Sequence, residues 1–292
     1  MSIHTRMLVI MLGETNKLKK RKGAKMKRAI FVFILLFFVA TQVHAMTLES
    51  TEQAINNSGK TRTLSMRMAN LYGIQVIKDY PTEKKRLAKK QLDEAKKVMN
   101  DIYKALLSYG PVTHKPELAR TVKEAQDNWH HMEKMLSKPP TQPAFLDVLD
   151  LSDRLLEANE MMTSYMESLS PVPTSEIINI AGRQGMYSQQ LARDYLAASL
   201  GIDKEYRIDL MLDVAVEFES AMLTMEGSTE NTAKIKGLIK SITKMEWRKV
   251  YGSVTECIES NGTKFNVGLL VKFCDTLLEK TTRLTGLYIE VS

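Results

Sequence analysis

The sequence contains little that enzymes or metalloproteins require. It has only 2 Cys in 292 residues, and no clustered Cys and His pattern of the kind that holds a metal ion. His130 and His131 are neighbours, so on a helix they point about 100° apart, and no third ligand follows at a suitable spacing. A nucleophile elbow, a phosphate loop and an HExxH pattern are also missing. We therefore expect a protein that is not an enzyme and that uses no metal or other cofactor.

Strand patterns are also scarce, and the prolines fall at apparent breaks. Stretches rich in Lys, Glu, Leu, Ala and Met predict helices throughout the part after residue 45. The first four helices are expected at Ser50–Tyr80, Thr82–Ser108, Pro116–Leu136 and Ala144–Ser168. Their breaks contain Pro81, Pro111 and the segment KPPTQP. Long helices with short connections are typical of an antiparallel four-helix bundle.

The helical plan repeats after residue 170. Four further helices are expected at Ser175–Leu200, Lys204–Met225, Thr232–Ser260 and Phe265–Val291. Trp129 and Trp247 hold the same place in the two third helices, and DRLLE in one last helix matches DTLLE in the other. An offset of about 120 residues held across a whole unit is typical of tandem duplication. The sequence thus predicts an all-α fold of two tandem antiparallel four-helix bundles, at residues 46–170 and 174–292.

The basic charge is concentrated in the first 45 residues. The whole chain carries a formal net charge of +7, whereas Met1–Ala45 alone contains nine Lys and Arg against a single acid, Glu14. The remainder is therefore close to neutral. Nucleic-acid binding needs a basic face on the folded part, so we expect no nucleic-acid partner.

The same residues resemble a secretory leader. From Met26 the sequence reads MKRAIFVFILLFFVATQVHA, in which two basic residues precede an apolar run too short to span a bilayer comfortably, and small residues follow. We expect residues 1–45 to be removed, with the natural start at Met1 or Met26 and the mature chain beginning near Met46. An uncleaved membrane anchor is the alternative. Either way, we expect the folded part outside the cytoplasm, in the periplasm.

A motif in the first helix recurs in the fifth. INNSGKTRTLSMRMA begins at Ile55, and INIAGRQGMYSQQLA begins at Ile178. The alignment superposes Asn56 on Asn179, Gly59 on Gly182, Lys60 on Arg183, Ser65 on Ser188 and Ala69 on Ala192. Arg62, however, falls on Gly185. The two copies therefore share their small residues but differ in one cation.

One face of the first motif combines small residues with that cation. It carries Ser58, Arg62, Ser65, Ala69, Tyr72 and Val76. Small residues let a second helix approach closely. An arginine buried there is costly unless it is paired, and its planar guanidinium suits a planar oxyanion. We expect Arg62 at a helix interface with an anion, and the uncharged second copy to be mainly a packing surface, with Arg183 near the gap at Gly185.

The order Asn, Gly, basic residue, Ser and Ala in both motifs resembles the PilJ-type N-terminal domain of the type IV pilus methyl-accepting chemotaxis transducer. It also resembles the extracytoplasmic domain of nitrate/nitrite sensor kinases. The resemblance covers both units and implies four-helix bundles in which an arginine from each of two protomers holds the anion at a dimer interface. Arg62 occupies the place of that arginine, with Gly59 and Ser65 in the surrounding motif. Gly185 departs from the pattern.

This departure leaves two arrangements open. If the two units pack as a pseudo-dimer, the site contains one arginine of the motif; if two chains form a homodimer through their first helices, two Arg62 side chains meet. The family's sensors also carry transmembrane and output segments. We therefore expect a membrane-bound sensor or transducer as the partner of this chain.

Cys257 and Cys274 lie on the last two predicted helices of the second unit. In an oxidising compartment these cysteines either form a disulfide or remain two buried free thiols. Antiparallel helices bring these positions together only if the intervening turn is asymmetric.

Two functions remain open from the sequence. The first is a secreted periplasmic sensory module that recognises a small anion such as nitrate or nitrite and signals to its membrane partner through helix shifts. The second is a non-catalytic helical scaffold or protein-interaction module whose ligand site has decayed. Arg62 favours the first function, and Gly185 favours the second.

Overall fold

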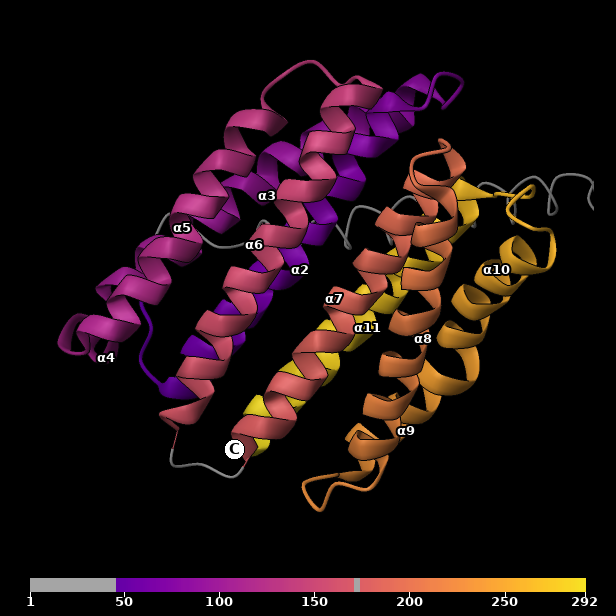
Figure 1. Cartoon of the computed structure of the whole chain (residues 1–292). Coiled ribbons are helices and arrows are strands. Elements are labelled where there is room, and N and C mark those ends of the chain that lie inside the picture. The colour runs from indigo at the N-terminus through magenta and orange to yellow at the C-terminus, as the bar shows by residue number, and fades with distance from the viewer. Residues whose placement is uncertain (1–45, 171–173) are drawn as a thin grey trace, which may run out of the picture. The chain divides into compact units, whose positions relative to one another are not determined.

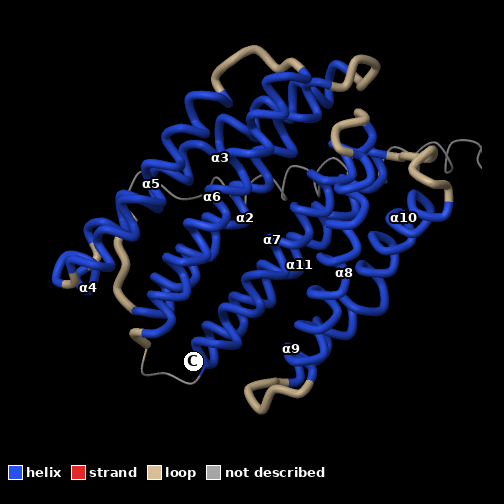
Figure 2. Tube along the Cα trace, in the orientation of Figure 1, coloured by secondary structure: helices blue, strands red, loops and turns tan. Residues whose placement is uncertain are grey.

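The computed structural model of the chain describes residues 46–170 and 174–292. The predicted leader, residues 1–45, lies outside the described residues. Every regular element in the described part is a helix (Figures 1 and 2). The prediction of an all-α fold is therefore confirmed.

The helices fall close to their predicted positions. They are α2 (Thr51–Val76), α3 (Thr82–Ser108), α4 (Gly110–His114), α5 (Pro116–Leu136), α6 (Gln142–Ser168), α7 (Thr174–Ser199), α8 (Lys204–Glu226), α9 (Ala233–Ser241), the π-helix η1 (Ile242–Trp247), α10 (Arg248–Glu259) and α11 (Val267–Val291). Side-chain caps fix several starts: the hydroxyl of Ser50 accepts a hydrogen bond from the backbone N–H of Gln53, at 3.2 Å.

Two details differ from the sequence prediction. The short helix α4 occupies what was expected to be a turn, and it begins with a proline in its first turn, where the missing N–H costs nothing. The single helix expected at Thr232–Ser260 is instead α9, η1 and α10 in continuous succession. A π-helix differs from an α-helix only in the register of its backbone hydrogen bonds, so the amino-acid composition of the segment does not distinguish the two.

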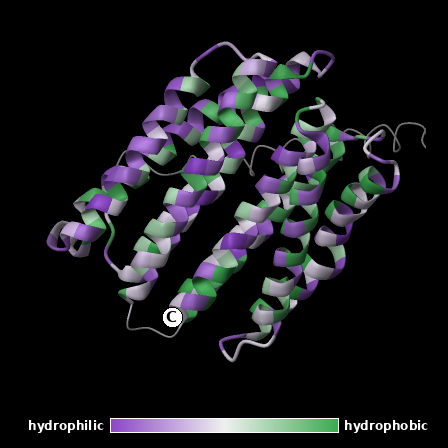
Figure 3. Cartoon of the chain, in the orientation of Figure 1, coloured by the Kyte–Doolittle hydropathy of each residue, from purple (hydrophilic) through white to green (hydrophobic). Residues whose placement is uncertain are grey.

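The long helices pack lengthwise through apolar faces. In the first half, α2 packs against α3 and α6, and α5 packs against α6; in the second half, α7 packs against α8 and α11. Helix α2 also packs extensively along α7, which joins the halves (Figure 1). Buried apolar residues from all the long helices form one core cluster. Figure 3 shows that apolar and polar residues are interspersed along each helix. This packing agrees with antiparallel bundles, and the division into two repeated units at 46–170 and 174–292 stays a prediction.

The two halves repeat one polar contact, which a buried tryptophan makes with an exposed acceptor. The indole N–H of Trp129, on α5, donates to Asn100 Oδ1 on α3 at 2.6 Å. The indole N–H of Trp247, at the end of η1, donates to Glu219 Oε1 on α8 at 2.8 Å. Both tryptophans are buried. Each third helix is therefore held to the second helix of its half by the same donor, which supports the proposed duplication.

Across residues 46–170 and 174–292, no helix combines the length and the apolarity that crossing a bilayer requires.

Candidate functional site at the interface of α2 and α7

Arg62 lies in the middle of the contact between the two halves. Its side chain projects from α2, and the residue has 0% of its surface exposed. Arg62 Nη1 donates to Glu160 Oε2 on α6 at 2.8 Å, and Nη2 donates to Asn179 Oδ1 on α7 at 2.7 Å. The guanidinium thus connects three helices, and the predicted position of Arg62 at a helix interface is what the structure shows.

Arg183 approaches the same carboxylate from α7. Its Nη2 donates to Glu160 Oε2 at 3.1 Å. Its side chain is 37% exposed and that of Glu160 is 27% exposed, whereas that of Arg62 is 1% exposed. Two guanidinium groups, one from each half, therefore converge on one carboxylate oxygen, with Arg62 at the buried end of the cluster and Arg183 at the solvent side.

The cluster has unused hydrogen-bonding capacity. The Nε atoms of Arg62 and Arg183 are both buried and have no hydrogen-bond partner. Each is an N–H donor without an acceptor, which is uncommon for buried polar groups. Two cations meet one carboxylate at this point, so the immediate contact carries an excess of one positive charge.

The electrostatic environment of Arg62 reflects opposing effects. Burial lowers the pKa of Arg62, the charge and hydrogen bond of Glu160 act to raise it, and the nearby charge of Arg183 acts to lower it. The guanidinium stays protonated, because an arginine is effectively always charged in proteins. The site is therefore permanently cationic at its inner end.

The glycines of the repeated motif leave room for this guanidinium. A Cβ atom at Gly59 would lie 3.1 Å from Arg62 Nη2, and one at Gly182 would lie 3.7 Å from the same atom. Ser65 has a different part, because its hydroxyl donates to the backbone carbonyl of Arg62 at 2.7 Å. The structure thus brings Gly59 and Arg183 to Arg62, whereas the Ser65 hydroxyl bonds its own helix.

The position equivalent to Arg62 in the second half is closely packed even around a single added carbon atom. A Cβ atom at Gly185 would lie 3.1 Å from Leu278 Cδ1 and 3.5 Å from Thr281 Oγ1, both on α11. Aligning DRLLE with DTLLE also places Thr282 opposite Glu160. The second half therefore lacks both the cation and its carboxylate partner, and α11 packs closely where they would be.

A second buried charge cluster was not predicted from the sequence. Arg193, on α7, is fully buried and donates to Ser152 Oγ at 2.9 Å and to Asp194 Oδ1 at 3.0 Å. It also pairs with Asp153 on α6. Arg207, on α8, donates to Asp194 Oδ1 at 3.0 Å. This cluster links α6 of the first half to α7 and α8 of the second, and its four charges balance.

The two cysteines are distant in sequence from the Arg62 cluster. Cys257 is on α10 and Cys274 is on α11, and both are buried free thiols. Burial raises the pKa of both thiols. Neither is therefore a reactive thiolate at neutral pH.

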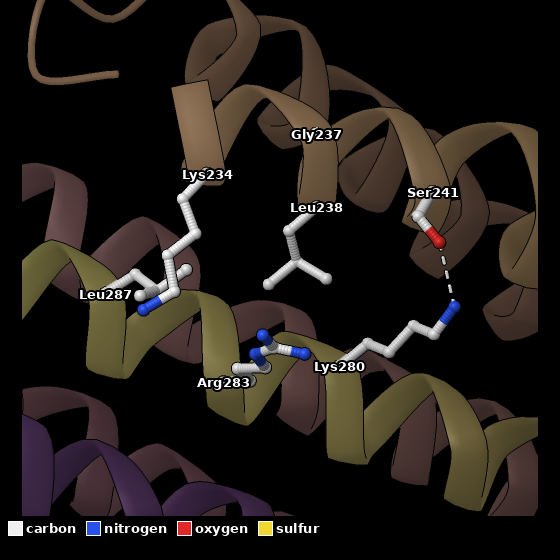
Figure 4. Close-up of a pocket in the computed structure, with 7 residues that line it drawn as sticks. All are labelled: Lys234, Gly237, Leu238, Ser241, Lys280, Arg283 and Leu287. Carbon is white, nitrogen blue, oxygen red and sulfur yellow. Dashed lines mark hydrogen bonds between the residues drawn. The ribbon is translucent and has the colours of Figure 1, made fainter. Parts of the chain in front are cut away.

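A surface pocket of about 270 Å³ opens between α9 and α11 (Figure 4). Its lining consists of Lys234, Gly237, Leu238, Ser241, Lys280, Arg283 and Leu287. Lys280 Nζ donates to Ser241 Oγ at 2.8 Å and to Glu246 Oε1 at 2.7 Å. No residue of the Arg62 cluster lines this pocket, and we assign it no part in the site.

Glu246, beside that pocket in η1, gives a testable pH dependence. Burial alone would raise the pKa of Glu246, but hydrogen bonds and charge from Lys280 and Lys249 outweigh burial and lower it. A lowered pKa stabilises the fold above the ordinary glutamate value, and this stabilisation is lost as pH falls through the lowered pKa. We expect Glu246→Gln to reduce the free energy of unfolding by about 1 kcal/mol at neutral pH.

Thermal unfolding across pH checks this result. The difference between Glu246→Gln and the unmodified protein should shrink as the pH falls below the ordinary glutamate pKa and through the lowered pKa of Glu246, where the carboxylate becomes protonated. Glu83→Gln is the control, because Glu83 pairs with Arg86 on an exposed surface and should matter little. A difference at Glu246 that is constant down to acid pH would contradict the assignment.

The fold and this cluster together define a helical-bundle protein with a buried cationic site where two long helices meet. Residues 45–155 match the family model PilJ, described as type IV pili methyl-accepting chemotaxis transducer N-term. The predicted resemblance to the PilJ-type N-terminal domain is thereby confirmed for this segment, which includes Arg62. The second copy of the domain and the resemblance to nitrate/nitrite sensor kinases stay predictions. For residues 45–155, the match indicates a sensory signalling module. The chain has no match among the curated proteins or the solved structures.

The sequence analysis did not assign the two residues that contact Arg62 from other helices. Glu160 and Asn179 contact Arg62 from α6 and α7, at separations of 98 and 117 residues along the chain. Asn179 carried a signal, since it aligns with Asn56 in the repeated motif. Glu160 carried none, because it is one acid among many on an amphipathic helix.

Proposed function

We propose that this chain is a periplasmic sensory module that binds a small oxyanion of the nitrate or nitrite class between Arg62 and Arg183. The observation that carries the proposal is the convergence of two guanidinium groups from different halves, each with a buried Nε–H that lacks an acceptor. Planar guanidinium donors match planar oxyanions, and charge-assisted hydrogen bonds of this kind are strong. The match of residues 45–155 to a chemotaxis transducer domain supports a sensory role.

The proposed site lies within one chain. The face of α2 that carries Arg62 packs against α7, so a second chain would have to displace α7 before two Arg62 side chains could meet. Arg183 supplies the second cation instead, from a position two residues before Gly185. We therefore favour the pseudo-dimer over a homodimer through the first helices.

Signalling would follow from the position of the site between packed helices. An anion there contacts α2 and α7 together, so occupancy favours one relative placement of these helices over another. A membrane-bound sensor or transducer that contacts the ends of these helices would detect the change.

Thermal unfolding with nitrate and nitrite tests the proposal. A ligand that binds the folded state at a hundredfold excess over its Kd adds about 2.7 kcal/mol of stability, so the Tm should rise with anion concentration. Arg62→Gln should abolish the rise. Arg67→Gln is the matched control, because Arg67 is also on α2 but pairs with Asp275 at 2.6 Å, outside the cluster.

The proposal fails if neither anion raises the Tm beyond the effect of chloride at equal ionic strength. It also fails if Arg62→Gln and Arg67→Gln respond equally.

A scaffold function is the second candidate, and one observation favours it. Glu160 already supplies a counter-charge to Arg62 at 2.8 Å, so the cluster is partly neutralised without any ligand. In that case the helices form a fixed interaction module, and no small anion changes the Tm.

A further inference from the structure

We infer that Glu160 is a tethered internal anion, which occupies the site in the absence of ligand and whose displacement loosens the polar connection of helix α6 to the α2–α7 interface. The inference rests on the proposed function, because it concerns how the same site is regulated. It is carried by the contacts that Glu160 and its neighbour Glu167 make with the interface of α2 and α7.

The carboxylate of Glu160 uses some of the donors that an oxyanion would need, because it accepts from an Nη atom of each arginine and leaves the Nε–H groups free. Its Oε2 accepts from Arg62 at 2.8 Å and from Arg183 at 3.1 Å. A carboxylate and a nitrate ion are both planar groups with oxygens around a trigonal centre, so each suits the same guanidinium donors. An anion that accepts from the free Nε–H groups in a bidentate manner also needs an Nη–H of each guanidinium. Glu160 accepts from one Nη atom of each arginine, so ligand binding competes with Glu160.

The exposure of the cluster permits this exchange. The Glu160 side chain is 27% exposed, so it lies at the solvent side of the buried guanidinium of Arg62. A carboxylate that leaves this position enters water rather than an apolar core, and its desolvation cost is recovered. Displacement is thus energetically accessible for Glu160, as it would not be for a fully buried acid.

A second carboxylate extends the effect along α6. Glu167 accepts a hydrogen bond from Asn179 Nδ2, and the Oδ1 of the same amide accepts from Arg62 at 2.7 Å. Glu160 and Glu167 are seven residues apart, which is two helical turns, so they project from the same face of α6. These two acids therefore fasten α6 to the α2–α7 interface, and both are connected to Arg62.

Exchange of Glu160 for a free anion would loosen one end of this connection. The internal carboxylate also lowers the apparent affinity for the ligand, because only the fraction of molecules with the donors free can bind it. Removing the carboxylate should therefore tighten anion binding and, at the same time, imitate the loosened connection between α6 and the α2–α7 interface.

The test compares nitrate binding by the full chain and by Glu160→Gln, using calorimetry. Breaking one charge-assisted hydrogen bond of the carboxylate raises the apparent Kd for nitrate by about a factor of ten or more. The Kd should therefore fall at least about tenfold in Glu160→Gln. Glu157→Gln is the matched control, since Glu157 is an exposed acid one turn earlier on α6. Its Kd should equal that of the unmodified protein.

Hydrogen exchange of the unmodified protein provides an independent measurement. Nitrate should accelerate amide exchange in α6 around residues 157–168, while it protects the neighbouring part of α2. If Glu160→Gln does not fold, Glu160→Asp replaces it, because the shorter side chain weakens the bridge to both arginines and should also tighten nitrate binding.

The outcomes separate the two proposals. If nitrate binds but the Kd of the Glu160 variants is unchanged or higher and exchange in α6 does not increase, the internal-anion role is wrong while the sensory site stands. If neither the unmodified protein nor the variants bind nitrate or nitrite, the proposed function fails and this inference fails with it.

Discussion

Replacing Asp194 with asparagine is expected to lower the free energy of unfolding by about 3–5 kcal/mol, because it leaves buried positive charge without its partner. Asp194 accepts from Arg193 at 3.0 Å and from Arg207 at 3.0 Å, and none of these three residues is more than 5% exposed. The remaining acid, Asp153, is 45% exposed and cannot balance two buried cations alone. Urea unfolding at neutral pH measures the loss.

The control for this substitution is Asp150→Asn. Asp150 and Arg154 are one helical turn apart on the exposed surface of α6 and form an ion pair at 3.0 Å. Exposed pairs of this kind contribute about 0.3–0.5 kcal/mol. Equal effects of the two substitutions would show that the Asp194 cluster does not hold α6, α7 and α8 together.

Gly73→Ala is expected to destabilise the protein by about 2 kcal/mol, although alanine is the better helix former. Gly73 lies near the end of α2, where α6 and α7 approach closely. A Cβ atom there would lie 2.5 Å from Phe145 Cζ and 2.7 Å from Leu196 Cδ2, and both side chains are fully buried. The cost of displacing two packed side chains exceeds the helical gain of about 1 kcal/mol.

Gly252→Ala provides the matched comparison. Gly252 is on α10, and a Cβ atom there would have no neighbour within 4 Å. This substitution should therefore stabilise the protein by about 0.5–1 kcal/mol. Thermal unfolding of the two variants should give changes of opposite sign. A stabilising Gly73→Ala would mean that α2, α6 and α7 are less closely packed at this end than the structure shows.

Helix positions were predictable because proline breaks and apolar periodicity act locally. Pro81 separates α2 from α3, and the predicted end of α3 at Ser108 is the observed one. The π-helix η1 was not predictable, since it depends on a shift in backbone hydrogen bonding that ordinary helical residues can adopt. Likewise, α4 arises from five residues around Pro111 that resemble a simple turn.

The site was predictable only in part. The small residues around Arg62 indicated a close helix contact, and the repeated motif pointed to Gly59 and Arg183. The acids that neutralise the arginines come from tertiary packing, and local sequence cannot distinguish Glu160 from solvated acids on the same helix. Arg193 and Asp194 were missed for a related reason: adjacent opposite charges usually mark an exposed surface, yet here both are buried.

The contact between α2 and α7 has a consequence for symmetry. A homodimer must carry every substitution twice, whereas two packed motifs in one chain can change independently. In the alignment of the two halves, Arg62 corresponds to Gly185 and the acid Glu160 corresponds to Thr282. The first half is therefore charged at this place, and the second half is closely packed there. The covalent connection also makes the pairing intramolecular, with an effective concentration that does not depend on how much protein is present. An interface of this kind stays assembled at low expression and can devote one of its two equivalent positions to a ligand.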